Sequence, residues 1–176
     1  MSGTVGDNVA RASGVIASAG GGGKILQMVQ MLKTDVGTYN SASYGAITGF
    51  ELAITPTKES SKIQLVINIG QLYATSTCGV KAARDIDGGG YSYLPAVGDG
   101  EGARSQAWLV QQAGTNGIVT GMYLDSPSYT LTDVITYQLH GKDGGGTMYF
   151  GRDNTDNDYD YRWRGAQIMQ LWEISA

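Results

Sequence analysis

The stretch Lys62-Ile63-Gln64-Leu65-Val66-Ile67-Asn68-Ile69-Gly70 determines the fold class of this chain. Its odd-numbered positions are all large aliphatic residues, whereas its even-numbered positions are mostly polar. Successive side chains of a β-strand point to opposite faces, so this two-residue period predicts a strand with one face on a hydrophobic core. The same alternation recurs over 47–55 and 134–140, which we also predict to be strands.

Shorter apolar runs on either side of these strands are separated by glycine-rich turns. Glycine makes up 27 of the 176 residues, and no segment has the period of an amphipathic helix. About eight or nine short strands favour an all-β, antiparallel β-sandwich of the jelly-roll type, although a nine-stranded barrel fits the same pattern. The remaining strands are predicted over 24–34, 80–84, 107–111, 121–124 and 147–150, with a closing segment over 161–173.

An extended N-terminal arm is predicted before this body. Four consecutive glycines, Gly20–Gly23, are costly inside a helix or strand, so we expect a hinge between an arm over 1–23 and a single domain over 24–176. The first predicted strand, 24–34, is apolar on both faces, as expected if one face meets the core and the other a partner. We expect the arm to contact a neighbouring subunit through Val5, Val9, Arg11, Val15 and Ile16.

Composition argues against several classes of function. The net charge of −4, the pI near 4.8 and the absence of a basic cluster argue against binding to nucleic acid. No apolar run approaches the length that spans a membrane. The single cysteine, Cys78, excludes an internal disulfide and is interpreted as a structural residue.

The densest group of carboxylates is a weak candidate for a calcium site. Read from Asp156, the spacing begins like an EF-hand loop, but Tyr161 and Gln167 stand where that loop needs glycine and glutamate. A less regular site stays open beside the interpretation as a solvated acidic loop, and we expect no other cofactor. The candidate ligands are Asp153, Asp156, Asp158 and Asp160.

Aromatic residues supply the candidate contact surfaces. As a strand, 158–164 would place Tyr159, Tyr161 and Trp163 on one face, either as part of the core or as a platform for a partner or a sugar ring. Tyr91 and Tyr93 lie in a predicted loop and are further candidates for partner contact. The only histidine, His140, has no flanking residues that indicate a catalytic set, and we predict an exposed polar residue and no enzymatic activity.

Several short segments carry a resemblance through their order along the chain. They are 7–16, 23–30, 47–56, 60–63, 125–128 and 164–166, with Glu173-Ile174 at the end. Taken in this order, they resemble a group of small tailed-phage virion proteins that is described as tail fibres, or as head decoration or cement proteins. The resemblance implies a compact β-sandwich that acts without enzymatic activity as a homo-oligomer, often a trimer.

Two functions follow from this resemblance as expectations. The first is a capsid decoration protein on the virion surface, assembled in the host cytoplasm, whose arm and first strand contact the major capsid protein or a sister subunit. In that case a chain lacking 1–19 should fold but no longer join particles. The alternative is a receptor-binding fibre or tip protein that binds host glycans through its aromatic loops.

Overall fold

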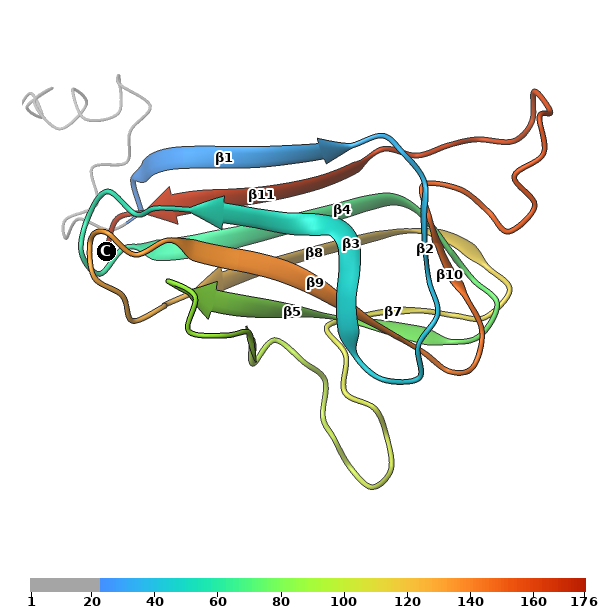
Figure 1. Cartoon of the computed structure of the whole chain (residues 1–176), viewed down its shortest axis with the longest axis horizontal. Helices are drawn as coiled ribbons and strands as arrows, with labels where there is room; N and C mark the ends of the chain where they lie inside the picture. The colour runs from blue at the N-terminus through green and yellow to red at the C-terminus, as the bar shows by residue number, and fades with distance from the viewer. Residues whose placement is uncertain (1–22) are drawn as a thin grey trace, which may run out of the picture.

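A computed structural model describes residues 23–176 of the chain, which form two antiparallel β-sheets packed face to face (Figure 1). This confirms the predicted all-β sandwich. The predicted arm, with Val5, Val9, Arg11, Val15 and Ile16, lies outside the described residues, apart from Gly23. Gly23 donates from its backbone nitrogen to the carbonyl of Ser175 at 3.1 Å, so the start of the described chain lies beside its end.

Eleven strands of the described residues make up the two sheets. Sheet A contains six of them and sheet B contains five. In chain order they are β1 (Ile25–Lys33), β2 (Gly37–Tyr39), β3 (Gly45–Ile54), β4 (Lys62–Ala74), β5 (Cys78–Ile86), β6 (Ser92–Tyr93), β7 (Leu109–Gln111), β8 (Asn116–Asp125), β9 (Ile135–Asp143), β10 (Met148–Phe150) and β11 (Gln167–Ile174).

The longer strands follow the order of a jelly roll. In sheet A, β1 pairs with β11, β11 with β4, and β4 with β8. In sheet B, β3 pairs with β9, β9 with β5, and β5 with β7. Along these eight strands the chain therefore passes from one sheet to the other at every connection except that from β5 to β7, which both lie in sheet B. This is the path of two interlocked Greek keys. The short strands β2, β6 and β10 extend the ends of this framework.

The core lies between the sheets and is built by the alternation seen in the sequence. The odd-numbered residues of β4, from Ile63 to Ile69, are fully buried, as are Ile135, Tyr137 and Leu139 of β9. Burying each such side chain contributes about 1.5–3 kcal/mol. β4 extends four residues beyond its predicted end, because Leu72, Tyr73 and Ala74 pair with β10.

A buried ion pair connects the two sheets. Arg84 of β5 donates from Nη1 to Asp125 Oδ2 of β8 at 2.5 Å, and the Tyr137 hydroxyl donates to the same oxygen at 2.7 Å. Burial raises the pKa of Tyr137, so its hydroxyl keeps the proton that it donates. Asp125 thus has two donors that compensate for the loss of its hydration.

The predicted closing strand over 161–173 begins only at Gln167, and residues 158–164 do not form a strand. These residues belong to a long loop between β10 and β11, drawn at the upper right of Figure 1. The core interpretation of its aromatic residues is also wrong, since Tyr159, Tyr161 and Trp163 are 54%, 61% and 77% exposed. Alternation alone was misleading here, because no strand of the described chain lies beside the loop to pair with it.

Candidate functional site

The outward-facing side of sheet A is broad, and its middle carries no charged residue of the described chain. Along the inner strands the even-numbered residues face outward, opposite the buried odd-numbered ones. The strand register aligns these outward residues in three rows across β1, β11, β4 and β8. The rows are Met28–Trp172–Gln64–Leu124, Gln30–Gln170–Val66–Met122 and Leu32–Ile168–Asn68–Thr120, which we call the uncharged face.

Large apolar side chains on the uncharged face remain exposed. Met28 and Leu32 on β1 are 53% and 58% exposed, and Met122 and Ile118 on β8, at the opposite edge of these four strands, are 62% and 72% exposed. The outward positions of a sheet in contact with water are normally polar or charged. Exposed apolar patches on such a face mark interaction sites. The uncharged face therefore has the composition of an interface.

The first strand, β1, is apolar on both sides. One side packs against the core and the other faces outward. Val29 and Met31 of β1 pack against the core, whereas Met28 and Leu32 point outward onto the uncharged face. Contact of the inner side with the core is therefore as predicted. The identity of the partner on the outer side stays a prediction.

A second surface lies on the outer side of sheet B, where tyrosines, lysines and a histidine meet. Tyr93 packs edge-on against His140, with ring centroids 5.3 Å apart, and against Tyr44 at 6.0 Å. Tyr91 lies 5.9 Å from the His140 ring. We call Tyr44, Tyr91, Tyr93, His140, Lys81, Glu51 and Gln138 the tyrosine cluster.

A chain of hydrogen bonds runs through the tyrosine cluster. The Tyr91 hydroxyl donates to Glu51 Oε2 at 2.9 Å, and the Gln138 amide donates to the same oxygen. His140 Nε2 bonds to Gln138 Oε1 at 2.8 Å, and the Tyr93 hydroxyl bonds to His140 Nδ1 at 3.2 Å. Since an amide oxygen only accepts, Nε2 carries the proton and Tyr93 donates to Nδ1.

Burial favours the protonation states that this chain of bonds needs. It lowers the pKa of His140, which keeps the imidazole neutral. Burial, together with the hydrogen bond to Glu51, raises the pKa of Tyr91 to about 12, which keeps its hydroxyl a donor. His140, predicted as an exposed polar residue, is instead half-buried and bonded at both nitrogens.

Lys81 of the tyrosine cluster and a second lysine, Lys142, both lie near the Tyr44 ring. Lys81 Nζ is 4.5 Å from the centroid of the Tyr44 ring and 5.0 Å from that of Tyr93. Lys142 Nζ is 6.0 Å from the Tyr44 ring and donates to Ser105 Oγ at 2.7 Å. Within residues 23–176 neither lysine forms an ion pair.

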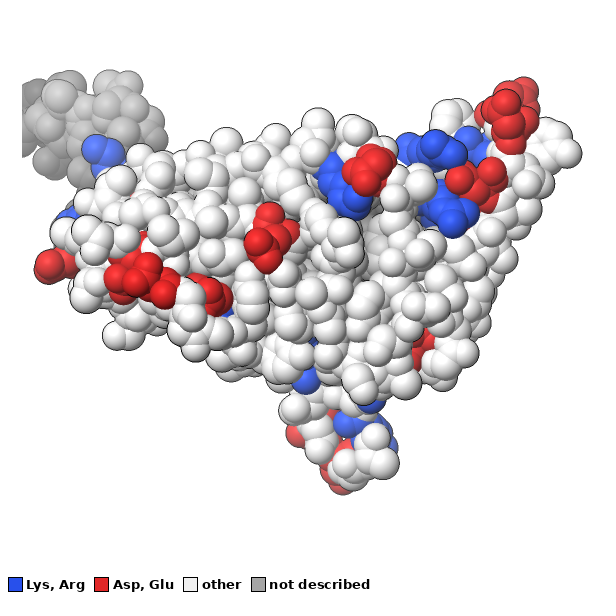
Figure 2. Space-filling model, viewed as in Figure 1, with Lys and Arg blue, Asp and Glu red and all other residues white. Residues whose placement is uncertain are grey.

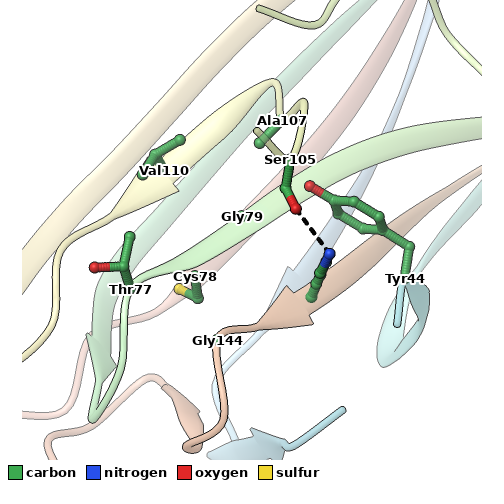
Figure 3. Close-up of a pocket in the computed structure, with 9 residues that line it drawn as sticks. Tyr44, Thr77, Cys78, Gly79, Ser105, Ala107, Val110 and Gly144 are labelled. Atoms are coloured by element: carbon green, nitrogen blue, oxygen red, sulfur yellow. Dashed lines mark hydrogen bonds between the residues drawn. The ribbon is translucent and has the colours of Figure 1, made fainter. Parts of the chain in front are cut away.

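A small pocket of about 140 Å³ borders the cluster at Tyr44 (Figure 3). Tyr44, Ser105, Ala107, Lys142 and Cys78 contribute to its walls. Burial raises the pKa of the Cys78 thiol to about 11, so the thiol stays protonated and is a poor nucleophile. This agrees with the structural role predicted for Cys78.

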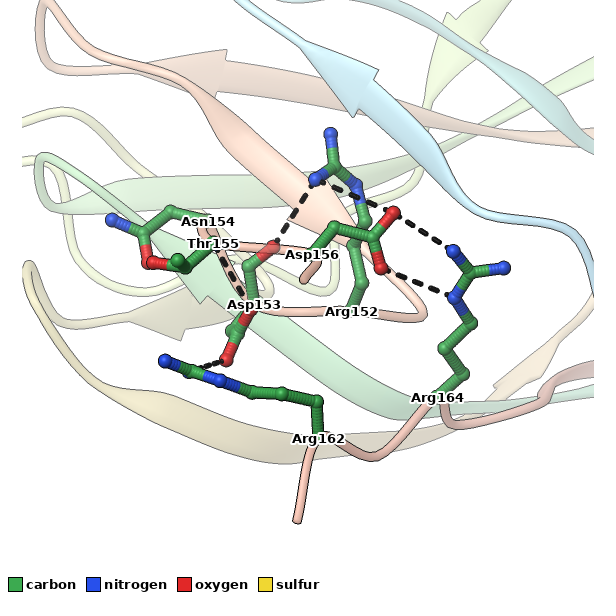
Figure 4. Close-up of polar contacts among 7 residues, drawn as sticks. All are labelled: Arg152, Asp153, Asn154, Thr155, Asp156, Arg162 and Arg164. Atoms are coloured by element: carbon green, nitrogen blue, oxygen red, sulfur yellow. Dashed lines mark hydrogen bonds and ion pairs between the residues drawn. The ribbon is translucent and has the colours of Figure 1, made fainter. Parts of the chain in front are cut away.

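The four predicted calcium ligands do not converge. In the loop between β10 and β11, Asp153 pairs with Arg162, and Arg164 binds both oxygens of Asp156 at 3.1 and 2.9 Å (Figure 4). Asp158 and Asp160 are exposed on the same loop. Across residues 23–176 no three carboxylate, histidine or cysteine side chains gather as metal ligands. The arginines neutralise the carboxylates that a cation would need.

The remaining predicted contact residues form a separate surface. The rings of Tyr159 and Tyr161 stack with centroids 5.2 Å apart, and Trp163 lies on the same loop. In the view of Figure 2, charged side chains gather on this loop and towards the edges of the molecule, and much of the surface between them is uncharged. Among the described residues no helix is long and apolar enough to cross a membrane.

Comparison with protein-family models and with curated proteins found no match for this chain.

Sequence reasoning found only part of the tyrosine cluster. It selected Tyr91 and Tyr93 but missed Tyr44, Lys81, Glu51 and Gln138, and it gave His140 no role. The alternation of β9 places Gln138 and His140 on one face, which was a usable signal. Glu51 and Lys81 lie opposite these residues because β3 and β5 pair with β9. This pairing of strands cannot be predicted from a single sequence.

Proposed function

We propose that this chain is a structural protein of a tailed-phage virion, a capsid decoration protein that forms homo-oligomers and bridges capsid subunits. The uncharged face is the observation that carries the proposal. An assembly protein needs a surface whose removal from water is favourable in itself. The exposed methionine, leucine and isoleucine side chains of the uncharged face provide such a surface. The sequence resemblance to phage virion proteins supports the location.

The size of the uncharged face suits contact with a sister subunit. Four strands about 4.8 Å apart, over roughly seven residues of about 3.4 Å each, give a flat footprint of about 450 Å². A standard interface buries about 800 Å² per partner, and projecting side chains make the accessible area larger than the footprint. The face therefore provides most of one interface. Its rim, and the arm that we predict to reach a neighbour, would supply the remaining contact area.

Assembly through this face is tested by placing a charge in its middle row, at Met122 on the edge strand β8. We expect Met122→Lys in the full chain to lower the mass measured by sedimentation equilibrium to that of a monomer, because a buried lysine without a partner is strongly unfavourable. Val110→Lys is the matched control, since Val110 is 59% exposed on sheet B. An oligomer that survives Met122→Lys, or a monomeric parent protein at high concentration, would contradict the proposal.

The position on the virion is tested by copy number. A decoration protein should be present in hundreds of copies per particle, and particles without it should lose resistance to heat. A few copies at one vertex would favour the alternative, a receptor-binding fibre or tip protein that binds host glycans. The tyrosine cluster is the feature that favours this alternative.

A further inference from the structure

We propose that the tyrosine cluster, with Lys81 and Lys142, is a binding site for an acidic saccharide, one that bears a carboxylate or a phosphate. The proposal goes beyond assembly through the uncharged face and does not depend on it. The two surfaces lie on opposite sheets, so each can be tested while the other is intact.

The polar groups of the cluster require a ligand that both donates and accepts hydrogen bonds. The Glu51 carboxylate can only accept, so a ligand group that meets its free oxygen must donate. The ammonium groups of Lys81 and Lys142 can only donate, so a ligand group that meets them must accept. Sugar hydroxyls do both, on neighbouring carbon atoms of one ring.

The charge of the cluster favours an acidic group on that ligand. Two ammonium groups approach the same Tyr44 ring, at 4.5 and 6.0 Å from its centroid, and no carboxylate of the described chain pairs with either. The protein as a whole carries a net charge of −4, so two neighbouring lysines without a paired carboxylate in residues 23–176 are not an average property of its surface. An anionic group of the ligand would be attracted to either ammonium group.

The aromatic rings provide an apolar wall beside these polar groups. Tyr91 and Tyr93 are 42% and 47% exposed, and each is fixed by a hydrogen bond through its hydroxyl. An exposed tyrosine ring suits a ligand with both apolar C–H faces and hydroxyl edges. Because each ring is already held in place, binding would cost little side-chain entropy.

An acidic peptide is the rival ligand. Its carboxylates would satisfy the lysines, but they only accept hydrogen bonds and would face the Glu51 carboxylate with a like charge. A saccharide with one acidic group places that group at the lysines and its hydroxyls at Glu51, Gln138 and Tyr91. The mixed polarity of the cluster therefore favours the saccharide.

The test is calorimetric titration of the full chain with trigalacturonate, which carries carboxylates, and with mannose 6-phosphate, which carries a phosphate. Methyl-esterified trigalacturonate is the neutral match, and short poly-glutamate is the peptide probe. We expect at least one acidic saccharide to bind, and the ester to bind at least about tenfold more weakly, because a charge-assisted hydrogen bond is worth about 1.5–3 kcal/mol.

Two variants identify the site. Lys81→Met keeps the length of the side chain but removes its charge, and Tyr91→Ala removes the exposed ring, and each should weaken binding by about tenfold or more. Lys58→Met is the matched control, an exposed lysine in the turn before β4, and it should bind like the parent. Trp163→Ala tests the loop between β10 and β11 as the rival site. Circular dichroism checks folding, and Lys81→Met alone decides the test if Tyr91→Ala does not fold.

Three results would overturn the proposal. The first is that the parent binds neither acidic saccharide at about 10 mM, a concentration about tenfold above a weak 1 mM site. The second is that poly-glutamate binds and the saccharides do not, which would assign the cluster to an acidic peptide. The third is that Trp163→Ala abolishes binding while Lys81→Met leaves it unchanged. None of these results bears on the oligomeric state of Met122→Lys.

Discussion

Among single residues, Glu173 holds the end of the chain to a distant turn. It is fully buried near the end of β11, and its carboxylate accepts backbone bonds from Thr57 at 2.9 and 3.0 Å and from Lys58 at 3.0 Å. The Gln27 amide donates to it at 2.8 Å. Burial acts to raise the pKa of Glu173, but these hydrogen bonds outweigh it, and the pKa lies below its ordinary value of 4.5.

We predict that Glu173→Gln lowers the free energy of unfolding by about 3 kcal/mol at pH 7, because it weakens several charge-assisted bonds at once. A carboxyl whose pKa is lower in the folded state stabilises the protein above its unfolded pKa, and this contribution is lost as the pH falls through the folded value. The parent should therefore lose stability below about pH 4.5 more steeply than Glu173→Gln does.

Urea unfolding at pH 7 and at intervals below pH 5 measures both effects. Glu59→Gln is the control, since Glu59 is an exposed acid in the same turn and should change the stability by less than about 0.5 kcal/mol. Equal stability of Glu173→Gln and the parent at pH 7 would show that the buried carboxylate does not hold the turn. The sequence near Glu173 carries no signal for this contact, because Thr57 lies 116 residues away along the chain.

Between elements, β4 and the start of β11 approach closely at a glycine pair. The Gly70 nitrogen donates to the Ala166 carbonyl at 3.1 Å, and a Cβ atom on Gly70 would overlap that carbonyl oxygen. A Cβ on Gly165 would lie 2.7 Å from the Gly70 carbonyl carbon. The two glycines thus allow β4 to leave β11 and continue alongside β10.

We predict that Gly70→Ala destabilises the protein by about 2 kcal/mol, seen as a fall in Tm of about 6 °C, because the added methyl group forces the two backbones apart. Gly98→Ala is the matched control: a Cβ there would meet only the Ala107 carbonyl at 3.9 Å, an ordinary contact. Thermal unfolding measures the Tm of both variants. Equal Tm values for Gly70→Ala and Gly98→Ala would show that the backbones at Gly70 and Ala166 leave room for a methyl group.

Strands were predictable where one face is buried along their whole length. The alternation of β3, β4 and β9 assigns Phe50, Ile67 and Tyr137 to the inward face, and all three are fully buried. The segment 158–164 alternates as clearly, yet it forms a loop fixed by ion pairs to Asp153 and Asp156. The short strands β2 and β6 have too few residues to carry a period, and they exist only because β10 and β5 lie next to them.

For the molecule as a whole, the two sheets offer opposite kinds of outer surface. Sheet A presents the uncharged face, and sheet B presents the tyrosine cluster with its lysines and Glu51. The sequence could not separate these surfaces, because both are made of outward residues from strands with similar patterns. Only the assignment of each strand to a sheet brings the rows of uncharged outward residues together on one side, and Lys81, Lys142 and Glu51 together on the other.

The absence of charge from the uncharged face has a consequence for how the protein responds to dissolved salt. Ions screen attraction between charged groups over about 10 Å at 0.1 M and about 3 Å at 1 M, but they do not weaken the burial of apolar surface. We therefore predict that the self-association constant from sedimentation changes less than about threefold between about 0.05 and 1 M NaCl. Saccharide binding at Lys81 should weaken over the same range of NaCl concentration, so ionic strength alone separates self-association from saccharide binding. An oligomer that dissociates in 1 M NaCl would show that its interface is not the uncharged face.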